Sequence, residues 1–187
     1  MVSQIGRIRS QILLLRYRRG DDEALSELAD LWERPLFYYI RRFVKSEEDA
    51  WDILQETWIR VFRGIGMLKN PESLHTWLYR IARNAALNYI RKNHKMNPLF
   101  DEEINITEIE HVENQGFSAA DAEAIHWGLQ QLPELQREVL TLFFLEEFSL
   151  KEIGFITGVS TGTVKSRLHY AKKTLLNIMK KEGLGYE

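Results

Sequence analysis

The sequence predicts an all-α protein made of two small helical domains joined by an acidic linker. Only 11 glycines and four prolines occur among its 187 residues, and apolar side chains recur at steps of three and four. Residues 1–95 carry 17 basic and 12 acidic residues. Residues 96–127 carry no basic and eight acidic residues, and residues 128–187 carry eight basic and seven acidic residues, so the acidic excess lies in the middle of the chain. We therefore expect domains over residues 1–95 and 119–187, with a linker over residues 96–118.

The composition also excludes several classes of chemistry. The absence of cysteine excludes disulfides, thiol nucleophiles and thiolate metal sites. The five histidines form no pair at the spacing of metal ligands, so we expect neither a metal nor a cofactor. No apolar run reaches the roughly 18 to 20 residues of a membrane span, so a cytoplasmic protein without membrane insertion is predicted.

Two helices are predicted in the middle of the first domain, whereas residues 1–19, with five arginines and no acid, receive no predicted role. An apolar pattern from Leu25 to Ile40 indicates one helix, with a kink or break at Pro35. Ser46 caps the next, in which an apolar stripe is expected at Trp51, Leu54, Trp58, Val61, Phe62 and Ile65. Another face carries Asp49, Asp52, Gln55 and Glu56. This acidic face is either a solvated surface or a docking edge for a basic partner helix.

A third helix is predicted from Pro71 to about Asn93. Its inner stripe includes Leu74, Leu78 and Ala85, and its outer face is basic. The cations and aromatic residues that alternate there are Trp77, Tyr79, Arg80, Arg83, Tyr89, Arg91, Lys92 and Lys95. Arginines that hold phosphates beside rings that stack on bases suit a single-stranded nucleic acid. The alternative is that the rings belong to the core and the arginines only solubilise.

The second domain contains a helix-turn-helix pattern. Pro133 marks a helix start, and Ser149 and Glu152 form a capping box before a short helix. A turn follows at Gly158, and Ser160 or Thr161 caps a longer helix with an inner stripe from Val164 to Ile178. The residues left on or beside its outer face are Thr163, Lys165, Ser166, Arg167, His169, Lys172 and Lys173. Such a helix can enter the major groove of DNA.

Three stretches together resemble the extracytoplasmic-function (ECF) group of bacterial sigma-70-type sigma factors. They are DAWDILQETWIRVF at residues 49–62, TWLYRIARNAALNYIRK at residues 76–92, and a third stretch running from LP at 132–133 through FSLKEI at 148–153 to GTVKSRL at 162–168. The resemblance covers about residues 8 to 180 in the family's order. Two departures are Asn88, where many members have aspartate, and Ser160, where proline is frequent.

The resemblance implies a non-enzymatic initiation factor that binds core RNA polymerase and promoter DNA, with sigma region 2 and region 4 folds. Core polymerase would bind Asp49, Asp52, Gln55 and Glu56. The residues implied for opening the −10 element and holding its single strand are Trp77, Tyr79, Arg80, Arg83, Asn84, Asn88, Arg91 and Lys92. Those implied for reading the double-stranded −35 element are Thr161, Thr163, Lys165, Ser166, Arg167, His169, Lys172 and Lys173. An anti-sigma factor is a further implied partner, and the acidic linker would thread the polymerase cleft.

Three other functions remain as alternatives. A helix-turn-helix regulator that is not a polymerase subunit would need a ligand pocket or a dimer patch in residues 20–95. A nuclease would need more clustered carboxylates for a metal than Asp49, Asp52 and Glu56 provide. A pure interaction protein that inhibits transcription would fail to support promoter-dependent RNA synthesis.

Overall fold

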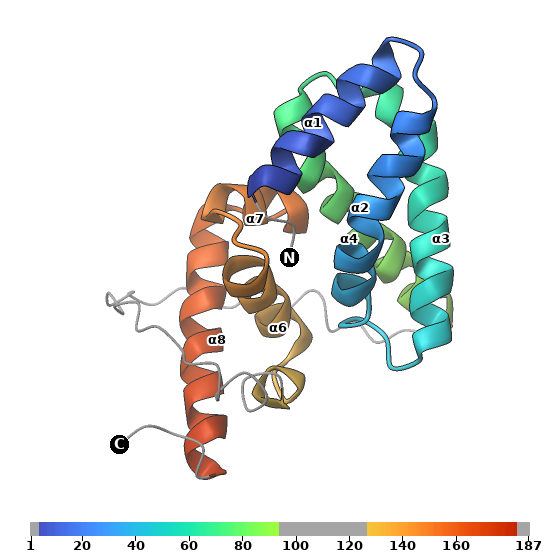
Figure 1. Cartoon of the computed structure of the whole chain (residues 1–187). Helices are drawn as coiled ribbons and strands as arrows, with labels where there is room; N and C mark the ends of the chain where they lie inside the picture. The colour runs from blue at the N-terminus through green and yellow to red at the C-terminus, as the bar shows by residue number, and fades with distance from the viewer. Residues whose placement is uncertain (1–3, 94–126, 183–187) are drawn as a thin grey trace. The chain divides into compact units, whose positions relative to one another are not determined.

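The computed structural model describes residues 4–93 and 127–182, and within these ranges the regular structure is entirely helical (Figure 1). The chain divides into two compact units, one containing α1 to α4 and the other most of α6 to α8. Their bounds are α1 Gln4–Arg18, α2 Glu23–Ile40, α3 Glu47–Gly64, α4 Leu74–Asn93, α6 Glu134–Leu140, α7 Leu150–Thr157 and α8 Thr161–Lys181. The all-α prediction is confirmed, whereas the predicted linker at 96–118 lies outside the described residues.

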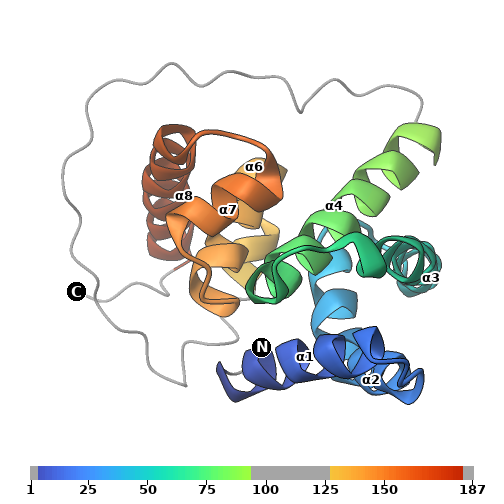
Figure 2. The same cartoon turned by 90° about the horizontal axis from the view of Figure 1, so that it is seen from above.

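The core of the first unit is centred on Trp32 of α2. In Figure 2, α1 lies along α2 and α3 lies beside α4, as the contacts between these helices require. The indole of Trp32 is buried against the ring of Tyr79 in α4, with ring centroids 6.1 Å apart. Its Nε1–H donates a hydrogen bond of 2.8 Å to Ser10 Oγ of α1. One side chain therefore joins three helices.

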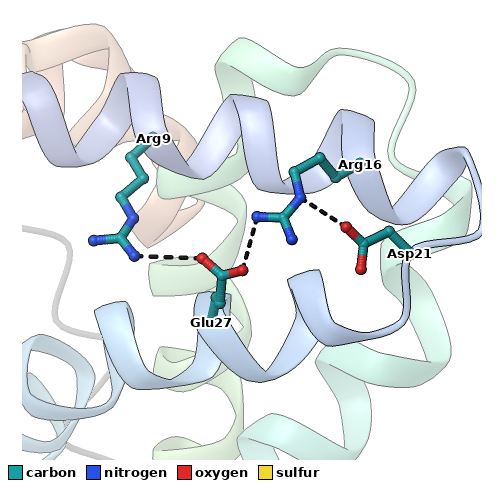
Figure 3. A network of polar contacts seen from close by, with 4 residues as sticks. All are labelled: Arg9, Arg16, Asp21 and Glu27. Atoms are coloured by element: carbon teal, nitrogen blue, oxygen red, sulfur yellow. Dashed lines mark hydrogen bonds and ion pairs between the residues drawn. The ribbon is translucent and has the colours of Figure 1, made fainter.

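Helix α1 was not predicted from the sequence. It packs on α2 through the buried Leu13 and Leu14. Figure 3 shows how ion pairs fix it: Arg16 donates to Asp21 and Glu27 at 2.7 Å each, and Arg9 lies 3.4 Å from the same Glu27. The pKa of Glu27 is lowered, first of all by its hydrogen bond from Arg16. Buried leucines and these ion pairs thus hold a helix whose own sequence shows no single apolar face.

The sequence predicts a kink or break at Pro35, and helix α2 continues through Pro35 to Ile40 without a break. Proline removes one backbone donor from a helix, but a kink can accommodate this loss when neighbouring residues are well packed. Leu28, Trp32 and Leu36 are all buried around this position. Packing against the rest of the unit therefore maintains the helix.

The second unit contains the predicted helix-turn-helix, formed by α7, a short turn and α8. Ser149 and Glu152 form the capping box, with Ser149 N–H donating to Glu152 Oε2 at 2.8 Å. Gly158 ends α7 in the left-handed region at φ 76°, which glycine adopts without steric cost. Ser160 then caps α8 by accepting from Thr163 N–H at 3.1 Å. These caps confirm the predicted starts of both helices.

Gly154 is expected to be essential for this turn, because its Cα lies close to the backbone after α7. A Cβ on residue 154 would lie 2.9 Å from the carbonyl oxygen of Val159. We expect Gly154→Ala to lower the free energy of unfolding by about 1–3 kcal/mol, a cost typical of forced overpacking. Urea unfolding followed by circular dichroism measures this loss.

The matched control is Gly162→Ala in the first turn of α8. There a Cβ would meet its nearest neighbour, Ser160 Oγ, at an ordinary 3.6 Å. Alanine favours a helix over glycine, so this variant should be as stable as the original chain or slightly more stable. Equal losses for the two variants would contradict the proposed close approach at Gly154.

Candidate nucleic-acid and protein interfaces

One side of α3 is an exposed surface of mixed acidic and apolar character. Ala50, Ile53, Leu54, Thr57 and Val61 are buried in the unit, which turns the opposite side of the helix outward. The exposed side carries Asp52, Gln55, Glu56, Ile59 and Phe62, which we call the α3 face. Glu56 also pairs with Arg60 on the next turn at 2.8 Å. The α3 face thus offers two carboxylates beside aliphatic and aromatic area.

Asp49 differs from the other predicted acidic residues because its carboxylate already has a partner inside the unit. The Tyr89 hydroxyl of α4 donates a hydrogen bond of 2.7 Å to Asp49 Oδ1. This bond is the main reason that the pKa of Tyr89 is raised above its ordinary value. Asp49 therefore links α3 to α4, while Asp52, Gln55 and Glu56 face solvent.

The predicted apolar stripe of α3 is wrong at two positions. Trp51 and Phe62 are exposed, while the smaller Ala50 and Thr57 occupy the packed side. Trp51 lies on the surface against Phe37, with ring centroids 4.3 Å apart. Ile59 and Phe62 were not predicted as part of the α3 face: Phe62 was assigned to the apolar stripe, and Ile59 was assigned to neither side. Ile59 lies three residues after Glu56, and Phe62 lies seven residues after Gln55. This helical spacing was the available signal that both lie on the same side of α3 as the polar residues.

The outer side of α4 carries the predicted cations. Arg80, Asn84 and Arg91 are exposed at spacings of four and seven, so they share one side of the helix. Lys92 is exposed at the end of the helix, and Arg83 and Asn88 are half-buried at the sides. Trp77 is also half-buried, because its ring packs against Gly64 at the end of α3.

Tyr79 does not belong to this surface, which corrects the sequence prediction. Its side chain is only 1% exposed, and its ring lies 4.9 Å from that of Tyr39 and 6.1 Å from that of Trp32. Helix α4 contacts α2 as well as α3, so its buried side is wider than a single stripe. The core interpretation of this ring is the correct one, and Tyr79 cannot stack on a base in this fold.

The segment before α4 contributes an exposed side chain that the sequence analysis did not select. Two short 3₁₀ turns, Ile65–Met67 and Pro71–Ser73, connect α3 to α4. Met67 is exposed at the first turn, and Arg18 of α1 donates a hydrogen bond to the carbonyl oxygen of Leu68. The connection is therefore tied to α1 while it presents an apolar side chain to solvent.

The outer side of α8 is a row of polar and cationic residues. Thr161, Lys165 and Lys173 are exposed, and His169 and Lys172 are half-buried beside them. The spacings of four place Thr161, Lys165, His169 and Lys173 along one side, which we call the α8 row. Thr163 lies beside the row, where its hydroxyl contacts Ser160 Oγ at 2.9 Å. The Lys172 ammonium lies 5.1 Å from the ring centre of Phe144.

Two residues predicted for this outer surface are buried instead. Arg167 is three residues after Val164 and four before Ala171, so helical periodicity places it on the packed side, where it is 9% exposed. Ser166 is also buried and donates its hydroxyl to the Gly162 carbonyl at 3.2 Å. Ser166 and Arg167 are therefore not part of the α8 row.

Two further properties concern residues 4–93 and 127–182 only. Within these ranges no three histidine or acidic side chains come together in a way that could hold a metal ion. None of the helices formed by these residues combines the length and the apolar character that crossing a membrane requires.

The geometry defines a class of protein: a two-unit helical chain whose second unit contains a helix-turn-helix with cations on its outer helix. Each of the two units matches the model of a known protein family. Residues 28–96 match Sigma-70 region 2, and residues 123–175 match Sigma-70, region 4. The matched segments occur in the same order as the two units.

Relatives match along most of the chain. It is 30% identical over 175 residues to the RNA polymerase sigma-H factor of Pseudomonas aeruginosa, covering 88% of this chain and 91% of the relative. It is 30% identical over 169 residues to the ECF RNA polymerase sigma factor SigW of Bacillus subtilis, covering 84% and 90%. The chain belongs to the extracytoplasmic-function group of the sigma-70 family of RNA polymerase sigma factors.

Two solved structures share its fold. CnrH, in complex with the cytosolic domain of CnrY, matches with a TM-score of 0.66 and 21% identity, covering 93% of this chain and 99% of that chain. The sigma factor RpoE, in complex with the anti-sigma factor NepR from Bartonella quintana, matches with a TM-score of 0.64 and 22% identity, covering 83% and 96%.

Proposed function

We propose that this chain binds core RNA polymerase and directs it to promoters by recognising −10 and −35 elements, without catalytic activity of its own. The observation that carries the proposal is the occurrence, in one chain, of a region 2 unit and a region 4 unit with exposed polar surfaces. These surfaces are the α3 face, the cationic side of α4 and the α8 row. Bacterial transcription takes place in the cytoplasm, and we propose that the chain acts there.

Each surface is assigned to the partner that its chemistry suits. The α3 face, with Asp52 and Glu56 beside exposed apolar area, suits a basic helical surface of the polymerase. Arg80, Arg91 and Lys92 on α4 suit the phosphates of the opened −10 strand, with Asn84 and Asn88 placed to contact bases. Asp49 holds α4 through Tyr89 and is assigned a positioning role.

The α8 row is assigned to the −35 duplex. Thr161 and Lys165 lie in the first turns of the second helix of a helix-turn-helix, which reach base edges when such a helix enters the major groove. Lys172 and Lys173 lie further along and suit the flanking phosphates. Phosphate contacts add affinity for DNA that decreases as the salt concentration rises. Two weak DNA-binding surfaces on one chain strengthen binding together only when the distance between them matches the distance between the two promoter elements.

An anti-sigma factor is proposed as a further partner. The solved RpoE structure with the same fold contains one, namely NepR. A protein that covered the α3 face or the α8 row would block the surfaces assigned above. We propose that this chain is inhibited in that way.

Run-off transcription with bacterial core polymerase on a promoter library tests the proposal. We expect RNA that begins at defined start sites only when the chain is present. Lys165→Ala with Lys173→Ala should reduce this transcript about tenfold, because it removes two cations from the α8 row. Lys180→Ala with Lys181→Ala removes two cations from the end of the same helix and should change it little.

Each negative outcome has a definite meaning. Sequence-specific DNA binding without start-site selection would favour a helix-turn-helix regulator that is not a polymerase subunit. Inhibition of transcription in every assay would favour an interaction protein. Equal losses for the two lysine pairs would overturn the assignment of the α8 row.

A further inference from the structure

The outer side of α1 presents a row of large aliphatic side chains to solvent. Ile5, Ile8, Ile12 and Leu15 are 79%, 52%, 54% and 45% exposed, respectively. We call these four residues the α1 stripe. The opposite side of the helix is buried against α2 through Leu13 and Leu14, so the stripe is not the side that holds the fold. A continuous apolar row on a folded surface indicates an interaction site.

The spacing of the α1 stripe indicates what binds there. The residues follow one another at steps of three, four and three, which is the a and d pattern of a coiled-coil seam. The stripe is narrow and contains no aromatic residue, whereas helices that lie in a membrane surface have a broad apolar side, often with tryptophan or phenylalanine. An α-helix packed along α1 fits this pattern best.

The fold holds the stripe outward. Ser10, on the buried side of α1, accepts the hydrogen bond from Trp32 and donates one of 2.7 Å to Gly6 O. Arg16 is held by Asp21 and Glu27 at 2.7 Å, as Figure 3 shows. Rotation of α1 to bury the stripe would break the bonds to Trp32, Asp21 and Glu27, which lie outside α1. The surface is therefore preformed.

The charges along α1 indicate the chemistry of the partner. Residues 1–20 contain five arginines and no acidic residue. Arg9 directly follows Ile8 at the edge of the stripe, and its side chain remains 60% exposed although it lies near Glu27. Arg18, near the other edge, is also exposed. A second copy would bring two arginine-rich helices together, whereas a helix with acidic edges would complement them.

We propose that the α1 stripe binds an amphipathic helix of a partner protein, with aliphatic residues along its seam and glutamate or aspartate at its edges. The stripe spans ten helical rises of 1.5 Å, or about 15 Å, which accommodates about two heptads of the partner. A free helix of this length is marginal in water, so the natural partner presents it from a folded or tethered protein. This inference does not depend on the proposed function, because its residues lie outside the α3 face, the cationic side of α4 and the α8 row.

Fluorescence anisotropy with the full chain and a synthetic peptide tests the inference. The labelled probe has three heptads with leucine at a and d and glutamate at e and g, and a second probe has lysine at e and g. The glutamate peptide is expected to bind at least about tenfold more tightly than the lysine peptide. Ile8→Lys with Ile12→Lys should weaken its binding at least about tenfold, because two seam positions become charged. Circular dichroism checks that this variant folds.

The matched control is Leu176→Lys with Asn177→Lys, which adds two lysines at exposed positions of α8. It should leave peptide binding unchanged. Equal binding of the two peptides, or no effect of the α1 variant, would overturn the proposal. If the chain self-associates in sedimentation equilibrium and the α1 variant abolishes this association, the occupant of the α1 stripe is a second copy of the chain and not a partner helix. If the chain floats with phosphatidylserine vesicles and the same variant abolishes this flotation, the α1 stripe binds a membrane surface and not a partner helix.

Discussion

Asp52→Lys with Glu56→Lys is expected to weaken assembly with core polymerase about a hundredfold or more. The two carboxylates are exposed one turn apart on α3, and the proposed partner surface is basic, so reversal of both charges turns attraction into repulsion. Each tenfold loss of affinity corresponds to about 1.4 kcal/mol, a modest cost for one reversed charge at a complementary interface. Fluorescence anisotropy of the labelled chain titrated with core polymerase measures the effect.

The fold itself should tolerate this change. Neither Asp52 nor Glu56 is buried, and the exposed pair between Glu56 and Arg60 contributes little to stability. The control is Asp30→Lys with Glu33→Lys, which reverses two exposed acidic residues of α2 on the same unit. If both variants weaken assembly equally, general repulsion explains the loss and the assignment of the α3 face is wrong.

Trp32→Ala is expected to have the largest effect on stability, about 3–5 kcal/mol, as for other buried aromatic residues. The substitution removes the ring that packs on Tyr79 and leaves a cavity between α1, α2 and α4. It also removes the donor to Ser10. Since small proteins are stable by about 5–15 kcal/mol in total, much of the first unit's stability would be lost.

Urea unfolding measures this loss. Four of the five tryptophans lie in α2, α3 and α4, so intrinsic fluorescence reports mainly on the first unit. Trp51→Ala is the control, because this exposed side chain contacts Phe37 on the surface and should cost much less. If the two variants shifted the unfolding midpoint equally, Trp32 would not be the centre of the core.

Features that depend on local chemistry were predictable from the sequence. Ser46, Ser149 and Ser160 each cap the helix that follows them, because a hydroxyl three residues before a backbone N–H satisfies it without help from the rest of the fold. The left-handed turn at Gly158 is equally local. The resemblance to the family rested on residues 49–62, 76–92 and 132–168, and the comparisons confirm it.

Features that depend on tertiary packing were not predictable in the same way. In α1, aliphatic residues occur on several sides, and only packing against the rest of the unit, chiefly α2, decides that Leu13 and Leu14 are buried while Ile12 and Leu15 are exposed. Tyr79 is buried because α4 packs against α2 as well as α3. Arg167 shows that a cation can lie on the packed side of a helix, where a rule based on residue type places it outside. The roles assigned to individual site residues stay predictions.

The hydrogen bond between Trp32 and Ser10 shows that the packed unit and the segment matched by the family do not have the same boundary. The match to the family begins at residue 28. The interior of the same unit also includes Ser10, which lies before that match and accepts the hydrogen bond from Trp32. The boundary of the family match therefore falls inside one packed unit, because the helix before it contributes to the same interior.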